Sequence, residues 1–463
     1  MEKKNTWETY SSKQLKELEK INAQYRDFLD NGKTERECID TIVNTIEKSG
    51  YRELESLIKE GTALKTGDKV YSVWMNKSIA MFQIGRKPMT DGMNILGAHI
   101  DSPRLDVKQN PLYEDGGFAY LDTHYYGGVK KYQWVTIPLA IHGVIVKKDG
   151  TCVEINIGEN EDDPVFFVSD LLIHLAQEQL EKKAAKVIEG EALDIIVGNK
   201  PLLIDKKDKK KDEKEAGKEA VKAGVLDILK ETYDIHEEDF VSAELEIVPA
   251  GKAREAGFDR SMTLAYGQDD RVCAYTSMQA MLDSDVTDRT MCCILVDKEE
   301  IGSVGATGMQ SHFFENAVAE VMNLAGEYSE LNVRRCLAHS CMLSSDVSSA
   351  FDPTYASSFD KKNVAYLGGG MVINKFTGAR GKSGSNDANA EYLAHLRHIF
   401  DKAEVNFQTA ELGKVDLGGG GTIAYILALY GMNVIDSGVA VLNMHAPWEA
   451  TSTVSYTHLR AHE

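Results

Sequence analysis

The sequence lacks three features that would place it in large classes of protein. It contains no run of 18 uncharged apolar residues, so it predicts no membrane-spanning helix. The first fifty residues are highly charged and have no apolar stretch of signal-peptide length. The chain has no excess of positive charge, and its net charge of −20 argues against nucleic acid, because phosphate contacts need a basic surface. We therefore expect neither a membrane nor a nucleic-acid partner.

Cysteine pairing is also absent. The sequence has no CxxC pair, which excludes the usual spacing of a structural zinc finger. Its seven cysteines are odd in number and mostly lie inside apolar runs. This pattern indicates reduced, buried thiols rather than a disulfide framework, and it favours a cytoplasmic protein.

Apolar and polar residues follow two different patterns in different parts of the chain. Its length of 463 residues suggests two domains or one domain with a large insertion. After Gly251, apolar runs alternate with helical stretches such as 387–403 and 422–429, which predicts a layered α/β domain. The runs expected to be strands are 291–296, 336–343, 364–367 and 439–444.

From about residue 106 to residue 250 the apolar and polar residues alternate with a period of two, as in antiparallel strands. We therefore predict a discontinuous α/β domain, 1–105 and 251–449, interrupted by a mainly β domain, 106–250. A lysine-rich run at 205–218 is interpreted as a solvated loop or, alternatively, a basic docking patch. Residues 450–463 are polar, without helical period or cap, and we treat them as an atypical tail outside the fold.

Candidate ligands stand where apolar runs end. His99 and Asp101 follow one run, Glu299 and Glu300 follow another, Asp346 a third, and His445 a fourth; Asp269 lies in the string GQDDR. In open α/β sheets, ligands bind beyond the carboxyl ends of the strands. Imidazole and carboxylate groups gathered there suit two divalent ions, which a bridging carboxylate can hold together.

Each of these residues has an ordinary structural explanation when it is taken alone. A histidine at a strand end commonly makes a structural hydrogen bond, and adjacent acids commonly form a solvated corner. The combination of five such positions, each on its own strand end, favours the metal site.

Five strings of this sequence together resemble the aspartyl aminopeptidase family. They are GAHIDSPRL (97–105), GQDDR (267–271), DKEEIGSVGATG (297–308), SSD (344–346) and LNMHAPWE (442–449). By this resemblance, His99 binds one metal ion and Asp101 orients it, while Asp269 bridges the two ions. Glu299 is implied as the general base.

The same resemblance supplies the remaining ligands and the wider function. Glu300 is implied as a ligand, Asp346 as a ligand to the other ion, and His445 as the last ligand. The ions are implied to be Zn²⁺, with Co²⁺ or Mn²⁺ as alternatives. The implied activity is that of a dinuclear metalloaminopeptidase, a hydrolase that cuts the first peptide bond of peptide substrates.

Fold and assembly follow from the resemblance as well. It implies a layered α/β/α metallopeptidase domain with a mixed sheet, an inserted mainly β dimerisation domain, and homodimers that assemble into a dodecamer. Two departures stand out: the tail from Thr451 does not resemble the family's closing helix, and Ser349 and Asp352 stand where eukaryotic members carry histidines.

The substrate preference has two candidate explanations. A basic cluster, Lys375, Arg380 and Lys382, lies in a glycine-rich stretch where the resembling family reads its substrate, and it favours acidic amino-terminal residues; the alternative is a solvated loop. His142 either donates to a neighbouring subunit's site or is a core histidine.

Rival functions are a glutamyl or deblocking aminopeptidase, another two-metal amide hydrolase, and a metal-binding scaffold without catalysis.

Overall fold

The computed structural model describes residues 5–202 and 219–456. The lysine-rich run predicted at 205–218 lies outside these residues. Within the described parts, no helix has the length and apolar character needed to cross a bilayer. The chain divides into two compact units, one formed by 1–102, 253–444 and 448–463, the other by 103–252 and 445–447.

A nine-stranded sheet forms the centre of the first unit. Its four middle strands β13, β4, β14 and β18 run parallel, whereas β2, β3 and β16 add antiparallel pairings, so the sheet is mixed, as predicted. In spatial order the strands are β1 (Arg52–Glu53), β2 (Lys69–Trp74), β3 (Ser78–Gln83), β13 (Met291–Val296), β4 (Asn94–His99), β14 (Cys341–Ser345), β18 (Asn433–Gly438), β16 (Met371–Asn374) and β17 (Phe407–Thr409).

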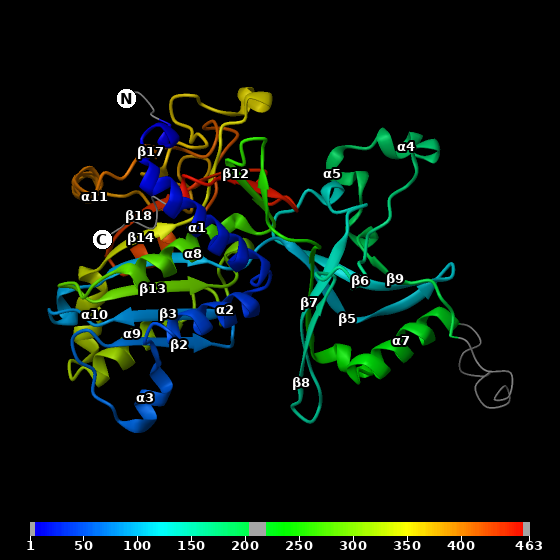
Figure 1. Cartoon of the computed structure of the whole chain (residues 1–463), viewed down its shortest axis with the longest axis horizontal. Helices are drawn as coiled ribbons and strands as arrows, with labels where there is room; N and C mark the ends of the chain where they lie inside the picture. Colours follow the sequence, from blue (N-terminus) through cyan, green and yellow to red (C-terminus); the bar gives the residue numbers. More distant parts are fainter. Residues whose placement is uncertain (1–4, 203–218, 457–463) are drawn as a thin grey trace. The chain divides into compact units, whose positions relative to one another are not determined.

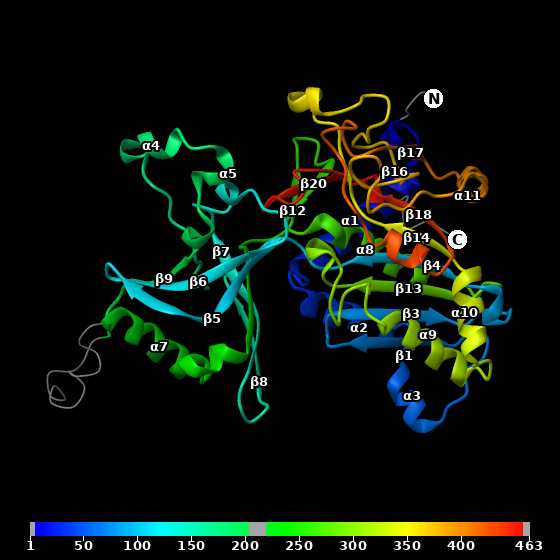
Figure 2. The same ribbon diagram turned by 180° about the vertical axis from the view of Figure 1, so that it is seen from behind.

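Helices cover both faces of this sheet (Figures 1 and 2). On β13, Cys293 and Leu295 pack into one core, whereas Cys292 and Ile294 pack into the other, because successive side chains of a strand point to opposite faces. One core takes residues from α1 (Ser12–Asp30), α2 (Glu35–Glu47), α8 (Gln268–Asp283) and α11 (Ala390–Lys402). The other takes residues from α3 (Leu54–Glu60), α9 (Phe313–Leu324), α10 (Glu330–His339) and α12 (Ala424–Ala428).

The first two helices begin where side chains cap their free amide groups. Ser11 and Gln14 form a capping box at the start of α1, and Thr34 and Glu37 form a second at the start of α2. Such boxes satisfy the N–H groups that have no partner inside the helix. The break between α1 and α2 contains Asn31-Gly32, which the sequence marks as a helix stop.

A five-stranded sheet in the first unit includes residues that the sequence analysis placed outside the fold. Strand β20 (Glu449–Ser452) pairs with both β12 and β19, and residues 450–456 are buried. The treatment of the chain after Glu449 as a tail is therefore wrong for 450–456, since strand pairing, not amphipathic period, holds this segment. The other strands are β11 (Arg254–Ala256), β12 (Met262–Ala265), β19 (Ala440–Leu442) and β15 (Ser348–Ser349).

The second unit is built on a six-stranded antiparallel sheet (Figure 2). Its order is β8 (Cys152–Ile157), β7 (Leu139–Val146), β10 (Ala243–Pro249), β5 (Arg104–Asp115), β6 (Phe118–Tyr126) and β9 (Ile195–Gly198). Helix α7 (Ala220–Tyr233) packs against β5, β6 and β9, and the short helices α4 (Gln177–Leu180) and α5 (Ala184–Val187) lie in the connection before β9. This unit is mainly β.

Candidate active site

His99 is the last residue of β4, at the edge where the parallel strands end. Only 2% of it is exposed, and its two ring nitrogens face different acids. Nδ1 lies 3.2 Å from Oδ1 of Asp101, and Nε2 lies 3.3 Å from Oδ1 of Asp269. One nitrogen is thus engaged by an orienting carboxylate, which leaves Nε2 to face the cluster, the usual arrangement of a metal-binding histidine.

Asp101 also fixes the segment that follows β13. Its Oδ1 accepts a hydrogen bond from the backbone N–H of Glu299, and its Oδ2 accepts one from that of Glu300, both at 3.1 Å. The Lys298 residue that precedes the pair adopts a positive φ of 70°. Asp101 is fully buried. A single carboxyl group therefore sets the ring of His99 and the backbone of both glutamates.

Asp269 stands at the start of α8, after Gly267. Gly267 has a φ of +69°, and a Cβ there would lie 1.7 Å from Nη1 of Arg271, so only glycine fits this turn. The backbone of Asp269 is held on both sides: its N–H donates to Oε2 of Glu449 at 2.9 Å, and its carbonyl accepts from Oγ of Ser102 at 2.6 Å.

Asp346 follows β14 at the same edge of the sheet. Its backbone packs so closely on β18 that a Cβ at Gly438 would lie 1.8 Å from the Asp346 carbonyl oxygen. One ligand atom each from His99, Asp269 and Asp346 lies within 4.8 Å of the other two. A carboxylate oxygen of Asp269 is also within 4.8 Å of one from Glu300.

The charges of this cluster suit a cation. Burial raises the pKa of Asp346 well above its usual range, and the nearby carboxylates of Asp270 and Glu299 raise it further. Burial and the charge of Asp269 also raise the pKa of Asp270, against the lowering effect of His99. Burial lowers the pKa of His99, but its contacts with Asp101 and Asp269 raise it overall. Acids this crowded repel one another, and divalent ions bound by imidazole and carboxylate groups would relieve that repulsion.

Two of the predicted residues are histidines of the second unit. His445 belongs to the second unit, where its Nδ1 is 3.0 Å from the carbonyl oxygen of Gly128. His142 is fully buried in β7, with Nε2 3.1 Å from Oε1 of Glu159. Neither contact tests the role predicted for these histidines.

The basic cluster is divided by its contacts. Lys375 and Lys382 both pair with Asp387, at 2.7 and 2.9 Å, and the ammonium of Lys382 lies 3.9 Å from the centre of the Phe376 ring. Arg380 is exposed and makes no ion pair among the described residues. Of the two candidates for binding the substrate, Arg380 and Lys382, Arg380 is therefore the one whose positive charge is not already paired within the part of the chain that the structure describes.

Two positioning residues were not identified from the sequence. Glu449 is buried with 1% exposed and holds the Asp269 backbone, while Gln268 donates through Nε2 to the carbonyls of Thr263 and Glu449. Glu449 ends the string LNMHAPWE, so its place in the family strings was the available signal. Its contact with Asp269, however, joins residues far apart in the chain and cannot be read from spacing.

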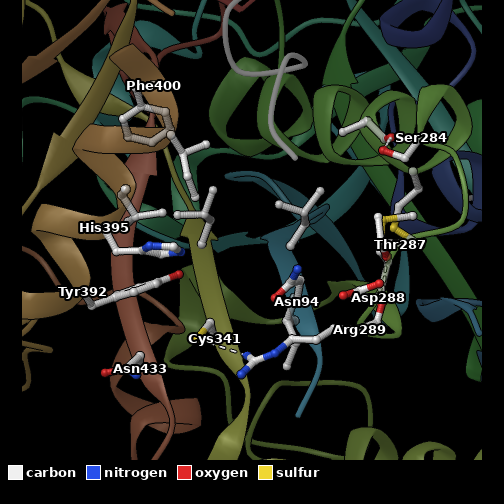
Figure 3. A pocket seen from close by; sticks show the side chains of 18 of the residues that line it. Asn94, Ser284, Thr287, Asp288, Arg289, Cys341, Tyr392, His395, Phe400 and Asn433 are labelled. Atoms are coloured by element: carbon white, nitrogen blue, oxygen red, sulfur yellow. Dashed lines mark hydrogen bonds between the residues drawn. The ribbon is translucent and has the colours of Figure 1, made fainter. Parts of the chain in front are cut away.

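A cavity of the first unit lies away from this cluster. It has a volume of about 790 Å³, and its lining includes Asn94, Cys341 and Asn433, the first residues of β4, β14 and β18 (Figure 3). His395 of α11 also lines it. Since the cavity lies at the amino ends of the strands and the acids at the carboxyl ends, the cavity is not the candidate metal site.

The chain is similar to known aminopeptidases over nearly its whole length. A relative from Clostridium acetobutylicum, described as a probable M18 family aminopeptidase 1, is 63% identical over 451 residues, covering 97% of this chain and 95% of the relative. The crystal structure of aminopeptidase I from that organism has a TM-score of 0.91 at 59% identity, covering 100% of this chain and 98% of the other. That of an M18 aminopeptidase from Thermotoga maritima has a TM-score of 0.92 at 43% identity, covering 100% and 99%. The resemblance to the aspartyl aminopeptidase type is thereby confirmed. Because the profile described as "Aminopeptidase I zinc metalloprotease (M18)" matches residues 28–461, the chain belongs to the M18 family of metal-dependent aminopeptidases.

Proposed function

We propose that this hydrolase removes single residues from peptide amino termini with two divalent ions and a glutamate base, and that it prefers acidic amino-terminal residues. The observation that carries the proposal is the group of His99, Asp269 and Asp346, whose ligand atoms lie within 4.8 Å of one another. Glu300 contributes a further carboxylate beside Asp269. This donor set is the kind that zinc accepts.

The assignment of ligands is as follows. His99, Asp269 and Asp346 would hold one ion, and Asp269 and Glu300 would hold the second. His445 is proposed as the last ligand, as the family resemblance implies. Zn²⁺ is the proposed metal, with Co²⁺ and Mn²⁺ as alternatives.

Each of the chain's own residues has a separate task in the reaction. When bound, the ions supply an activated water and polarise the scissile carbonyl. Glu299 takes the proton of the attacking water and returns it to the leaving amine. Asp101 keeps His99 oriented and holds the Glu299 backbone, so that the base and the ligand share one support.

The preference for acidic residues is assigned to Arg380. Its guanidinium can bind a carboxylate through two hydrogen bonds, whereas Lys382 is already paired with Asp387. The Lys382–Asp387 pair is about half exposed, so a substrate carboxylate could still compete for Lys382. We therefore rank Arg380 first and Lys382 second.

The proposed enzyme works as a cytoplasmic homo-oligomer. The 103–252 unit is proposed to form dimers, and dimers to form a dodecamer; the mApe1 of Saccharomyces cerevisiae, whose solved structure is 19% identical to this chain, is a dodecamer. His142 is proposed to reach the site of a neighbouring subunit if assembly frees it from Glu159. The seven cysteines are free, which suits a reducing compartment.

Metal removal followed by a substrate panel tests the proposal. Chelation should abolish the hydrolysis of Asp-, Glu- and Leu-anilides, and added Zn²⁺ should restore it, with close to two ions bound per chain. Active protein with less than one ion per chain would contradict the metal assignment. Equal kcat/KM values for Asp and Leu substrates would contradict the preference and point to a broader aminopeptidase.

Arg380→Met tests whether Arg380 binds the side-chain carboxylate of the substrate. It should lower kcat/KM for Asp and Glu substrates by about tenfold or more, roughly 1.4 kcal/mol of transition-state binding, and leave Leu substrates nearly unchanged. Equal losses on both classes would indicate a structural loop instead.

A further inference from the structure

Two loops in the first unit pack directly on each other. The basic loop, residues 378–384, carries Arg380, and the glycine segment, residues 418–421, precedes α12. The N–H of Gly378 donates to the carbonyl of Gly420 at 2.6 Å. Gly419 has a φ of +121°, and a Cβ there would lie 2.4 Å from the Gly378 oxygen. The basic loop therefore rests on the glycine segment with no room for a side chain between them.

Both loops are tied to the same strand, β18. At the end of the basic loop, Nδ2 of Asn386 donates to the carbonyl of Val434 at 2.8 Å. At the end of the glycine segment, Oγ1 of Thr422 donates to Oδ1 of Asp436 at 2.5 Å. The two anchor points are two residues apart on a central strand, so β18 fixes the ends of both loops.

Asp436 is an unusual residue for its position. It is only 2% exposed, between Ile435 and Ser437 in the middle of the sheet, where burial of a carboxyl group is costly. Burial raises its pKa to about 7, against the hydrogen bonds of Thr422 and Asn386, which lower it. A buried acid that belongs to no metal group of the described residues requires another explanation, and its bond to Thr422 provides one.

We propose that Asp436 is a positioning residue for substrate selectivity, acting through Thr422. Their hydrogen bond fixes the glycine segment, and the glycine segment supports the basic loop, so that Arg380 is held where an acidic amino-terminal side chain binds. The inference rests on the proposed function, because it requires that Arg380 reads the substrate.

A purely structural role for this pair predicts different behaviour. Oγ1 of Thr422 also accepts a hydrogen bond from the N–H of Ala424 at 3.2 Å, at the start of α12. If the pair served only that helix, its loss would lower stability and reduce activity on every substrate alike. The ratio of kcat/KM for Asp and Leu substrates separates the two roles, because a reduced folded fraction cancels from the ratio.

The experiment compares four variants and one control variant of the zinc-loaded full chain. Thr422→Val removes the hydroxyl and keeps the shape, and it should lower the Asp/Leu ratio by about threefold or more, as expected when a positioned group moves. Thr422→Ser keeps the hydroxyl and should restore the ratio. Asp436→Asn keeps an oxygen acceptor and should stay near wild type, whereas Asp436→Leu should behave like Thr422→Val. Thr45→Val, which removes a helical hydroxyl bonded to the Thr41 carbonyl, controls for loss of a threonine hydroxyl elsewhere.

Comparison with Arg380→Met identifies which idea fails. If Arg380→Met lowers the ratio but Thr422→Val does not, the positioning role is wrong, and the assignment of substrate recognition to Arg380 stands. If Arg380→Met leaves the ratio unchanged, that assignment is wrong and the inference falls with it. In the double variant, Thr422→Val should add no further loss of ratio, because it acts through Arg380; additive losses would overturn the inference.

Discussion

At the residue scale, the chemistry depends on side chains placed where strands end. The sequence allowed His99 and Asp346 to be selected because each ends an apolar run, and the structure brings them together with Asp269. It did not allow the selection of Glu449 or Asp436. Their contacts with Asp269 and Thr422 are made by the folded chain and leave no periodic signal in the sequence.

Glu299→Gln tests the proposed general base. Glutamine keeps the size of the side chain but cannot accept the proton, so kcat should fall by about 100-fold or more. Metal content should not change, because Glu299 is not among the assigned ligands. Turnover is compared at equal metal occupancy. Wild-type turnover in the variant would reject the role of Glu299.

Asp436 predicts a pH dependence of stability. Its pKa is raised from 3.8 to about 7 in the folded state, so the folded protein holds the proton more tightly than the unfolded chain. Its contribution to stability therefore falls as pH rises from about 4 to above 7. The largest loss in the free energy of unfolding from this group is roughly 4 kcal/mol, at 1.36 kcal/mol per pKa unit.

Asp436→Asn removes this dependence. The Tm of the variant relative to wild type should increase steadily between pH 5 and pH 8, as measured by thermal unfolding. A difference in Tm that does not change with pH would show that the buried carboxyl carries no charge penalty. Asp360→Asn, at an exposed acid whose pKa is lowered by Asn363, is a control that should show no such increase.

At the scale of elements, the presence of a strand was easier to predict than the residues at which it begins and ends. The strand at 291–296 was predicted with its observed bounds, because it is buried on both faces and reads as one apolar run. The run 336–343 was predicted as a strand, but Cys336 and Leu337 belong to α10 and the strand begins at Cys341. Two buried helix residues that are followed three residues later by a buried strand give a mostly apolar stretch, which periodicity cannot divide.

Strand β20 is the element that connects the end of the chain to the candidate site. Glu449→Ala would leave the N–H of Asp269 without its acceptor and free the backbone of the proposed bridging ligand. Metal affinity should fall by about 10-fold or more, in the range seen when support of a ligand is lost. Competition with a chelator measures it. Glu449→Gln keeps an acceptor oxygen and should lose much less; an Ala variant with wild-type affinity would contradict the positioning role of β20.

At the scale of the whole molecule, the predicted α/β class and the family are confirmed, whereas the assembly that the same resemblance implies is not tested by the fold of one chain. Composition shows no subunit contact, and the dimerisation role of the inserted unit remains a prediction. The unit does expose large apolar side chains over ten residues, which we name the 171–180 patch. They are Leu171, Leu172, Ile173, Leu175 and Leu180, between 46% and 68% exposed.

Apolar side chains gathered in this way usually mark a contact surface. If the 171–180 patch lies between subunits, Ile173→Asp with Leu175→Asp buries two charges at that contact and should yield a smaller species by light scattering. Leu331→Asp, at an exposed leucine of α10 in the other unit, is the matched control and should keep the wild-type mass. Activity on Asp-anilide should fall with the smaller species if His142 serves a neighbouring site, and should persist if His142 is only a core residue. A wild-type monomer with full activity would refute assembly, and an unchanged mass in the double variant would remove the patch from the interface.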